Sequence, residues 1–196
     1  MSYGCEKLGK SYGGRKVLAD LTLSFSPGER ICIAAPSGGG KTTLLRLLAG
    51  LERPDSGRVI GFDRAQLSMV FQEDRLFGQR SPVANVAMTQ KGPDRAAIAA
   101  ALKELLPAHC LDQPVRELSG GMRRRVAIVR AVLHRSDVLL LDEPFAGLDE
   151  ENRAKAIRFI RDRQGDRLLL FTAHSPEEGG LLDMDRACCL PCLESD

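Results

Sequence analysis

A glycine-rich loop ending in Lys41 and Thr42 has the residue types of a phosphate-binding site. Gly38, Gly39 and Gly40 would let backbone N–H groups close around the phosphates of a nucleotide. The Lys41 ammonium would then reach the β and γ oxygens, and the Thr42 hydroxyl would hold Mg²⁺. An apolar run precedes the loop and a helical pattern follows it, as a phosphate loop requires.

The loop departs from the usual phosphate-loop pattern at its first position, where Ala35 replaces glycine. Because Pro36 biases the preceding residue toward extended backbone angles, alanine meets no penalty there. We therefore expect the loop to bind a nucleotide triphosphate, the alternative being a glycine-rich turn with no ligand.

Two adjacent carboxylates end the apolar run 138–141 and would form a second part of the site. Asp142 would hold the hydrated Mg²⁺, and Glu143 would polarise an attacking water molecule. An Asp-Glu pair at a strand end is by itself more often solvated. A phosphate loop in the same chain favours the catalytic interpretation.

A second loop, Ser119-Gly120-Gly121, has the composition of another anion site. The serine hydroxyl and the glycine N–H groups could approach a phosphate, and the helix that follows would add its positive dipole end. Taken alone, these residues would more simply be a serine-capped helix start. Their position between the phosphate loop and Glu143 favours phosphate binding.

Three single residues have side chains that suit the same chemistry. Gln72 offers an amide to Mg²⁺ or the attacking water, His174 could contact the γ-phosphate, and Tyr12 could stack on an adenine ring. Each has a plainer alternative: a surface glutamine, a histidine at a strand end and a tyrosine at a sheet edge. His109 and His134 have no comparable setting and are interpreted as structural.

Apolar runs that alternate with helical patterns predict an α/β fold, a P-loop NTPase core with a largely parallel sheet. We expect a small, trimmed antiparallel β-subdomain and an α-helical subdomain inserted at about 73–125, within a single domain spanning 1–196. The expected strands are 17–25, 31–35, 138–141 and 168–171, and the expected helices are 42–49, 96–106, 122–134 and about 150–163.

The composition of the 196 residues indicates which partners and which cellular compartment to expect. A formal net charge of +2 gives no signature of nucleic-acid binding. The apolar runs are too short to cross a bilayer, and no secretory leader is visible, so we expect a cytoplasmic protein.

Cysteines and a basic cluster remain outside the predicted site. The six cysteines are expected to be reduced in the cytoplasm. Cys189 and Cys192, with Cys188 beside them, have metal-like spacing, and we interpret them as packing residues because a second pair is missing. The cluster Arg123, Arg124, Arg125 and Arg130 is interpreted as a solvated helix face, with phosphate attraction as the alternative.

Together and in this order, these motifs resemble those of the ATP-binding subunit of an ABC transporter, over almost the whole chain. The resemblance implies ATP and Mg²⁺ as cofactors. It also implies a role for each matching position: Tyr12 at the adenine, 35–43 (with Pro36, Ser37 and Thr43) as the phosphate loop, Gln72 in the Q-loop, 118–122 as the signature, Asp142 and Glu143 as the Mg²⁺ and catalytic carboxylates, Asp149 in the D-loop and His174 as the switch histidine.

The same resemblance implies partners. Two copies would sandwich two ATP molecules head to tail, with Ser119, Gly120 and Gly121 of one copy on the phosphate held by Lys41 of the other. A separate membrane permease would dock on residues 72–88, at the cytoplasmic face of the membrane, and would connect to an extracytoplasmic solute-binding protein. A stand-alone subunit without membrane segments resembles bacterial importers more than exporters. Residues 71–76 are similar to the nitrate, sulfonate and taurine importers, although Phe77-Gly78-Gln79 replaces the expected Leu-Pro-Trp continuation.

Three departures from the family pattern stand out. Met122 replaces the commoner glutamine, residues 146–149 vary the D-loop but retain Asp149, and the stretch from Lys41 to Gln72 is short. The alternative functions are a non-transport ATPase of the same superfamily, acting in DNA repair or on the ribosome, and a small P-loop kinase. A kinase would leave the signature loop unexplained.

Overall fold

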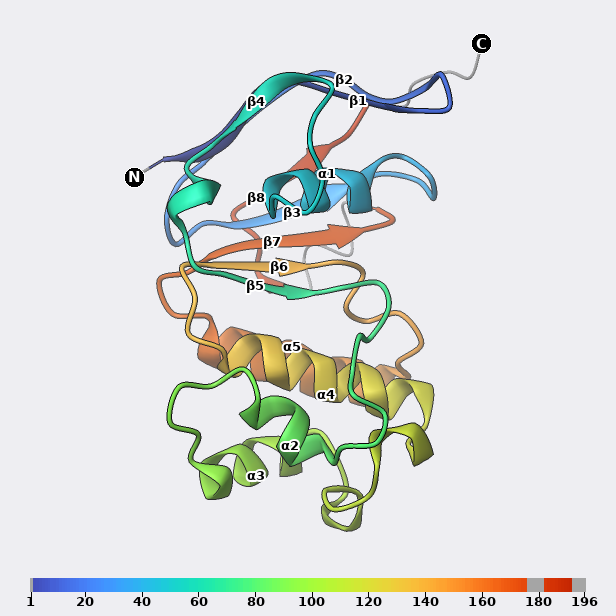
Figure 1. The fold of residues 1–196 in the computed structure, drawn as a ribbon, viewed down its shortest axis with the longest axis vertical. Helices are drawn as coiled ribbons and strands as arrows, with labels where there is room; N and C mark the ends of the chain where they lie inside the picture. Colours follow the sequence, from blue (N-terminus) through green and yellow to red (C-terminus); the bar gives the residue numbers. More distant parts are fainter. Residues whose placement is uncertain (1, 176–181, 192–196) are drawn as a thin grey trace. The chain divides into compact units, whose positions relative to one another are not determined.

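The computed structural model describes residues 2–175 and 182–191 (Figure 1). The chain divides into two compact units. The first, the sheet unit, comprises residues 1–67, 136–142 and 166–196, and the second, the helical unit, comprises residues 68–135 and 143–165. The expected α/β class is confirmed by a parallel sheet, an antiparallel sheet and helices.

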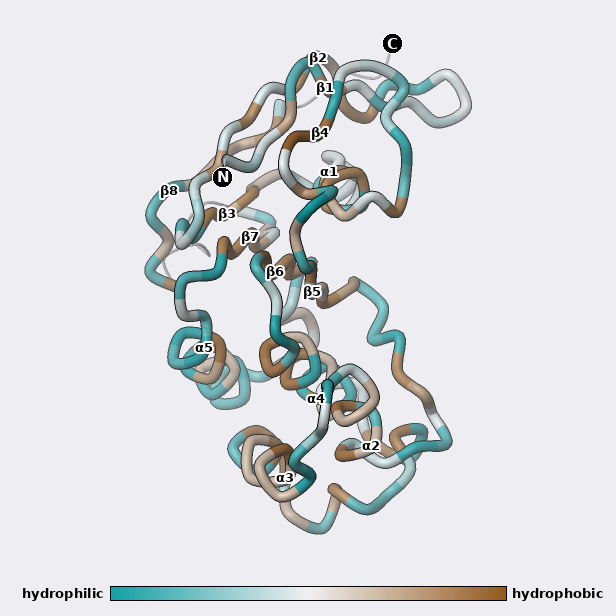
Figure 2. The backbone as a smooth tube through the Cα atoms, turned by 60° about the vertical axis from the view of Figure 1, so that its left-hand side comes forward, coloured by the Kyte–Doolittle hydropathy of each residue, from teal (hydrophilic) through white to brown (hydrophobic). Residues whose placement is uncertain are grey.

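A largely buried sheet contains the predicted apolar runs. Its strand order is β5-β6-β7-β3-β8, and the β6–β7, β7–β3 and β3–β8 pairs are parallel. The central strands β6 and β7 are buried at every position, as expected of strands covered on both faces, and they appear brown in Figure 2. The bounds are β3 (Arg30–Ala34), β5 (Leu67–Val70), β6 (Val138–Leu141), β7 (Leu168–Ala173) and β8 (Arg186–Cys189).

The parallel strands place three predicted site segments at one edge of the sheet. The last residue of β3 pairs with the last residue of β7, and the last residue of β6 pairs with Phe171. The phosphate loop, Asp142 and His174 directly follow these three strands. Because the carboxyl ends of parallel strands share an edge, these segments lie at the same end of the sheet.

Helix α1 (Lys41–Leu48) begins at the end of the phosphate loop. Leu44, Leu45, Leu47 and Leu48 are buried, which explains why this short leucine-rich segment is helical in its tertiary context. The predicted stop is confirmed, since α1 ends just before Gly50, whose φ of 68° is left-handed.

A three-stranded antiparallel sheet, in the order β2-β1-β4, forms the small β part of the sheet unit. Its strands are β1 (Tyr3–Tyr12), β2 (Arg15–Phe25) and β4 (Ser56–Ile60), and a 3₁₀ turn, η1 (Phe62–Arg64), follows β4. The sequence predicted only β2. Strand β1 was missed because register shifts between Cys5 and Ser11 interrupt its alternation, and Lys7 within it has a φ of 48°.

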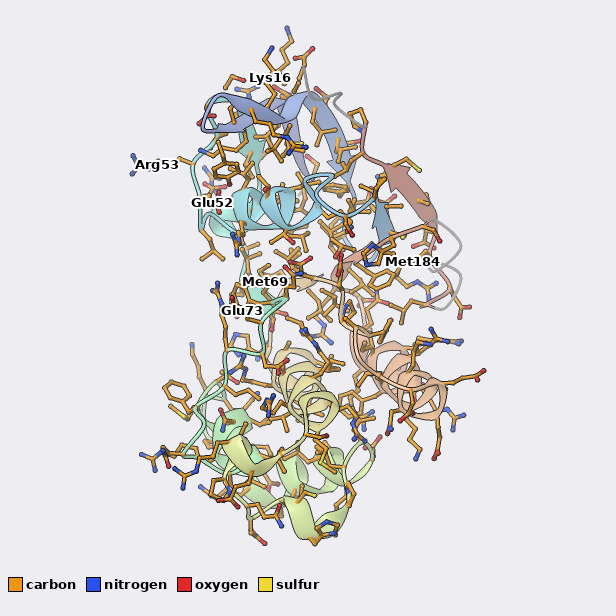
Figure 3. All side chains as sticks on the ribbon, turned by 90° about the vertical axis from the view of Figure 1, so that its right-hand side faces the viewer. Lys16, Glu52, Arg53, Met69, Glu73 and Met184 are labelled. Atoms are coloured by element: carbon orange, nitrogen blue, oxygen red, sulfur yellow. The ribbon has the colours of Figure 1, made fainter. Side chains whose placement is uncertain are left out.

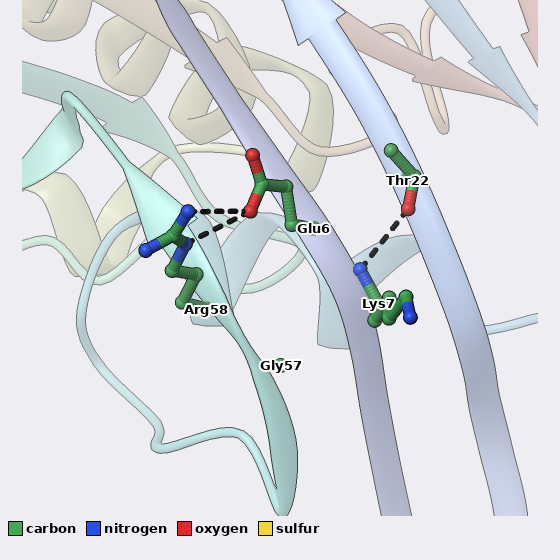
Figure 4. Close-up of a pocket in the computed structure, with 5 residues that line it drawn as sticks. All are labelled: Glu6, Lys7, Thr22, Gly57 and Arg58. Atoms are coloured by element: carbon green, nitrogen blue, oxygen red, sulfur yellow. Dashed lines mark hydrogen bonds and ion pairs between the residues drawn. The ribbon is translucent and has the colours of Figure 1, made fainter.

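The irregular part of β1 lies against Gly57 of β4. An open cavity of about 570 Å³ is lined here by Glu6, Lys7, Thr22, Gly57 and Arg58 (Figure 4). The Lys7 N–H donates to the Thr22 hydroxyl at 3.0 Å, and the Arg58 guanidinium pairs with Glu6 at 2.7 Å. A Cβ on Gly57 would lie 2.2 Å from the Lys7 carbonyl oxygen, so only glycine permits this approach.

The helical unit contains four α-helices and two 3₁₀ turns among the described residues: α2 (Pro82–Ala87), α3 (Arg95–Lys103), η2 (Ala108–Cys110), η3 (Val115–Glu117), α4 (Gly120–Leu133) and α5 (Glu150–Gln164). The three longer α-helices were predicted to within a few residues, whereas α2 was missed. The buried Asn85 of α2 fixes the preceding loop, because its amide donates to the carbonyls of Phe77, Arg80 and Ser81.

Neither membrane spans nor metal clusters are found within the described ranges. No described helix is long and apolar enough to cross a membrane. No group of three or more potential His, Cys, Asp or Glu ligands occurs in residues 2–175 and 182–191. Cys188 and Cys189 lie on β8, and Cys192 lies outside the described residues.

We predict that Gly57→Ala destabilises the protein far more than Gly13→Ala. Both glycines have left-handed φ angles, 74° and 56°, so both alanines carry a backbone cost of about 1–2 kcal/mol. Only the Gly57 variant also meets backbone atoms, and we expect that overpacking to add about 1–3 kcal/mol. Urea unfolding followed by far-ultraviolet circular dichroism measures both, since the chain has no tryptophan. Equal losses would contradict the close packing of β1 against β4.

Candidate functional site

The Lys41 side chain is held inside the phosphate loop. Its ammonium donates to the carbonyl oxygens of Ala35 at 2.8 Å and Pro36 at 3.3 Å, and the residue is 4% exposed. These bonds compensate much of the cost of burying the charge. The loop also lines a cavity of about 230 Å³. Its lining residues come from the loop (Pro36, Ser37, Gly38 and Gly39), from β2 (Arg15, Lys16 and Val17) and from Pro191 beyond β8.

The three loop glycines are required for different reasons. Gly38 and Gly40 have left-handed φ angles of 77° and 84°. A Cβ on Gly39 would lie 2.8 Å from the Cβ of Ala35, so its hydrogen side chain makes room for the alanine that departs from the usual pattern. Ala35 has no positive φ and is 4% exposed, which agrees with the expectation that alanine is tolerated there.

Asp142 presents an unpaired buried carboxylate oxygen. The residue is 1% exposed, and its Oδ1 accepts a hydrogen bond of 2.9 Å from the Thr172 hydroxyl. Its Oδ2 is buried and meets no hydrogen-bond donor among the described residues. A buried carboxylate oxygen without a donor is costly unless a cation binds it, so this atom fits a Mg²⁺ ligand or a ligand to Mg²⁺-bound water.

Tyr12 is anchored to the segment that follows α1. It ends β1 and is 45% exposed, and its hydroxyl donates to the carboxylate of Glu52, which lies just past α1 (Figure 3). Glu52 also pairs with Arg46 of α1 at 3.4 Å. Partial burial raises the pKa of the Tyr12 phenol, the bond to Glu52 raises it further, and a hydrogen bond from Thr43 opposes them. The ring is therefore fixed relative to the helix that carries Lys41.

The signature loop begins α4 in the helical unit. Ser119 is the N-cap, and its Oγ accepts from the Met122 N–H at 3.2 Å. The capping alternative is therefore observed, but it uses only an acceptor site of the hydroxyl, whose proton can still be donated to a phosphate. Gly120 is exposed, whereas a Cβ on Gly121 would lie 3.3 Å from the Gly147 carbonyl oxygen of the D-loop.

Arg125 connects the signature loop to the D-loop within the helical unit. Its guanidinium donates to the carbonyl of Gly121 at 3.2 Å and to the amide oxygen of Asn152 at 2.6 Å. Asp149 caps α5 and accepts from the Asn152 N–H at 2.8 Å. That backbone hydrogen bond lowers the pKa of Asp149, and burial lowers the pKa of Arg125, which Asp149 partly opposes.

The basic cluster on α4 is not a solvated face, and this prediction was wrong. Arg124 and Arg125 are 7% and 8% exposed. Arg123 and Arg130 are half-buried, and all four donate hydrogen bonds to backbone carbonyls of the helical unit. The periodicity of α4 could not reveal this, because Arg124, Arg125 and Arg130 also donate to carbonyls of residues 71–75 and 105, which are distant along the chain.

Glu143 and Gln72 belong to the helical unit, and His174 belongs to the sheet unit. Glu143 is half-buried and has a φ of 45°, a strained angle for a residue other than glycine. Gln72 is exposed just after β5, and His174 is exposed just after β7. The roles assigned to these three side chains stay predictions.

Sequence reasoning missed two residues that fix the nucleotide-site side chains. Thr172 orients Asp142, and a lone threonine within the apolar run that forms β7 was a usable signal. Glu52 orients Tyr12, and no local pattern identified it.

Comparisons with known proteins identify the family that this chain matches and several of its relatives. Residues 18–146 match the family described as ABC transporter. The chain is 40% identical over 190 residues to the aliphatic sulfonates import ATP-binding protein SsuB 1 of Rhodococcus jostii (strain RHA1), covering 93% of this chain and 76% of that protein. It is 39% identical over 199 residues to the sulfate/thiosulfate import ATP-binding protein CysA of Burkholderia mallei (strain ATCC 23344), covering 91% of this chain and 57% of that protein.

Solved structures show the same fold. A bacterial Atm1-family ABC exporter with ATP bound superimposes with a TM-score of 0.83 at 28% identity, covering 97% of this chain and 37% of that one. The dimeric bacterial ABC transporter cassette MJ0796 superimposes with a TM-score of 0.83 at 24% identity, covering 97% and 94% of the two chains.

We predict that Glu52→Gln lowers the pKa of Tyr12. The chain has two tyrosines, so a Tyr3→Phe background leaves Tyr12 as the titrating phenol. Removing the Glu52 charge removes one cause of the raised value, and ultraviolet absorbance of the phenolate against pH gives the midpoint. Glu6→Gln, on the same strand as Tyr12, is the control and should leave the midpoint in place. An unchanged midpoint in Glu52→Gln would exclude the anchoring contact.

Proposed function

This chain belongs to the ABC transporter family, and on that premise we propose that it is the ATP-hydrolysing subunit of an importer with a separate membrane permease. The observation that supports this most is the presence, in one chain, of two glycine-rich loops that suit anion binding. One ends at the buried Lys41 and the other opens α4 at Ser119. The named relatives are import ATP-binding proteins, so the DNA-repair and ribosome alternatives are not favoured.

The sheet unit would bind most of the nucleotide. Gly38–Gly40 backbone N–H groups and Lys41 would hold the phosphates, and the anchored Tyr12 ring would stack on adenine. Thr42 and Asp142, with the buried Oδ2 of the latter, would hold Mg²⁺, which neutralises phosphate charge when bound. His174, at the same sheet edge, would donate to the γ-phosphate.

Hydrolysis would use residues of the helical unit. Glu143 would accept a proton from the attacking water, and the Gln72 amide would orient that water or complete the metal shell. Ser119, Gly120 and Gly121 would hold the γ-phosphate of a nucleotide bound to a second copy, and Asp149 would lie near that interface. Each complete site would therefore need two copies of the chain.

A nucleotide that contacts both copies only when they close can drive closure. Moving such an equilibrium from 1:99 to 99:1 takes about 5.5 kcal/mol of differential binding. Charge-assisted hydrogen bonds to the γ-phosphate are strong enough to supply it in combination with the α4 dipole. Hydrolysis removes the bridging phosphate and releases the pair, which is the mechanical step that a permease would use.

The permease would dock on residues 72–88 of the helical unit. Two large apolar side chains there are unusually exposed, Phe77 at 57% and Met88 at 55%. Contiguous exposed apolar patches mark protein-binding surfaces, so these two side chains are the ones that the proposed docking would bury. We place this subunit at the cytoplasmic face of the membrane, with an extracytoplasmic solute-binding protein reached through the permease.

We predict that Glu143→Gln retains ATP binding, loses hydrolysis by at least about 100-fold and accumulates an ATP-dependent dimer, because the bridging phosphate persists. Light scattering with and without ATP gives the mass. Glu150→Gln, an exposed glutamate on α5, should behave like the unmodified protein. A monomer at saturating ATP would argue against the sandwich.

We predict that Ser119→Arg leaves ATP binding by the monomer intact and abolishes turnover, because the arginine would block the second copy's phosphate. Mixing this variant with Lys41→Ala gives a sharper test. In a head-to-tail pair, one of the two sites then has both an unmodified Lys41 and an unmodified Ser119, so activity should partly return. If Ser119 served the nucleotide of its own copy, the mixture would stay inactive.

A further inference from the structure

Arg124 binds the backbone of the segment that carries Gln72. Its Nη1 donates to the Phe71 carbonyl at 2.5 Å, and its Nη2 donates to the carbonyl of Gln72 itself. The Arg124 Nε lies 3.5 Å from a carboxylate oxygen of Asp74. One planar guanidinium therefore contacts three points of residues 71–74, which suits the fixed fork of arginine and not the single ammonium of lysine.

Arg130, farther along α4, binds the other end of the same segment. It donates to the carbonyls of Asp74 at 3.2 Å and Arg75 at 2.8 Å. The Arg75 guanidinium in turn lies 3.9 Å from the centre of the Phe71 ring, so the segment folds on itself. Carbonyls 71, 72, 74 and 75 thus all bind arginines of one helix.

The segment depends on these arginines because it has left the sheet. Strand β5 ends at Val70, so the carbonyls beyond it lie outside the strand and need other partners. The Arg124 side chain is only 9% exposed and Asp74 is 21% exposed, so their contacts are shielded from water. Hydrogen bonds from a charged donor in such a setting are stronger than those between neutral groups.

We propose that Arg124 is a positioning residue for Gln72, and that Arg130 secures the far end of residues 71–75. The two arginines attach the Gln72 backbone to the helix whose N-cap is Ser119. Gln72 and the signature loop then move as one body, and the Gln72 amide reaches its nucleotide from a fixed backbone. This inference rests on the proposed role of Gln72 in hydrolysis.

Tryptic cleavage after Arg75 in nucleotide-free protein tests the attachment without any reference to ATP. Arg124→Gln should raise the cleavage rate by about tenfold or more, because opening the segment no longer breaks two charged hydrogen bonds. Arg124→Lys should also raise it, because a single ammonium lacks the planar fork with which the guanidinium contacts both carbonyls and Asp74 at once. Arg135→Gln removes an exposed charge just beyond the same helix and should leave the rate unchanged. Unchanged cleavage in both Arg124 variants would overturn the attachment.

A double-mutant comparison tests the positioning role. Arg124→Gln should lower kcat for ATP by about tenfold to a hundredfold with little change in KM, as expected when a side chain is misplaced. Combined with Gln72→Ala, it should add nothing to the loss from Gln72→Ala alone, because both changes remove the same contribution. A full kcat in Arg124→Gln, or additive losses with a lowered unfolding temperature, would overturn positioning in favour of a structural role. If Gln72→Ala were fully active, the proposed role of Gln72 would fail, and with it the positioning role, while the cleavage result would still decide the attachment.

Discussion

The nucleotide site depends on the hydrogen bonds between the Lys41 ammonium and the carbonyls of its own loop. A buried ammonium requires acceptors, and the chain supplies them from Ala35 and Pro36. Those bonds fasten the first residue of α1 to the start of the loop, and the Gly39 N–H closes the turn by donating to the Pro36 carbonyl at 3.0 Å. The geometry holds only if Gly39 lacks a Cβ, because a methyl group there would meet Ala35. Ala35, which replaces the usual glycine, therefore fits only because Gly39 has no side chain.

Buried charged groups of the helical unit likewise donate hydrogen bonds to backbone carbonyls. Arg124 and Arg125 face carbonyls of residues 71, 72, 105 and 121. An arginine-rich helix can therefore be a buried scaffold for irregular segments as well as a solvated surface. Loops that must hold a shape without a ladder of backbone hydrogen bonds gain most from this arrangement. The Gln72 segment, which follows the end of β5, is such a loop.

Sequence patterns predicted the parts of this protein whose determinants are local. The strands β3, β6 and β7 are buried on both faces, so each consists of consecutive apolar residues that the sequence shows directly. Strand β1 follows a bulged path, and its pairing with β4 depends on Gly57, so no alternation marks it. The motif residues were found because their types are chemically specific. Glu52 was not found, and Arg124 was interpreted as solvated, because their roles arise from contacts 40 and 52 residues away along the chain.

The junction between Asp142 and Glu143 shows how the fold separates two chemical tasks. The chain leaves the sheet unit between these adjacent residues, and Glu143 takes a φ of 45° there. A left-handed angle costs a non-glycine residue about 1–2 kcal/mol, and glycine would avoid that cost. Glycine would also remove the carboxylate. If the buried Asp142 holds a cation and Glu143 meets the attacking water, the chain needs a carboxylate at position 143 in spite of the strained backbone angle. The strain at Glu143 therefore agrees with the proposed catalytic role of its side chain.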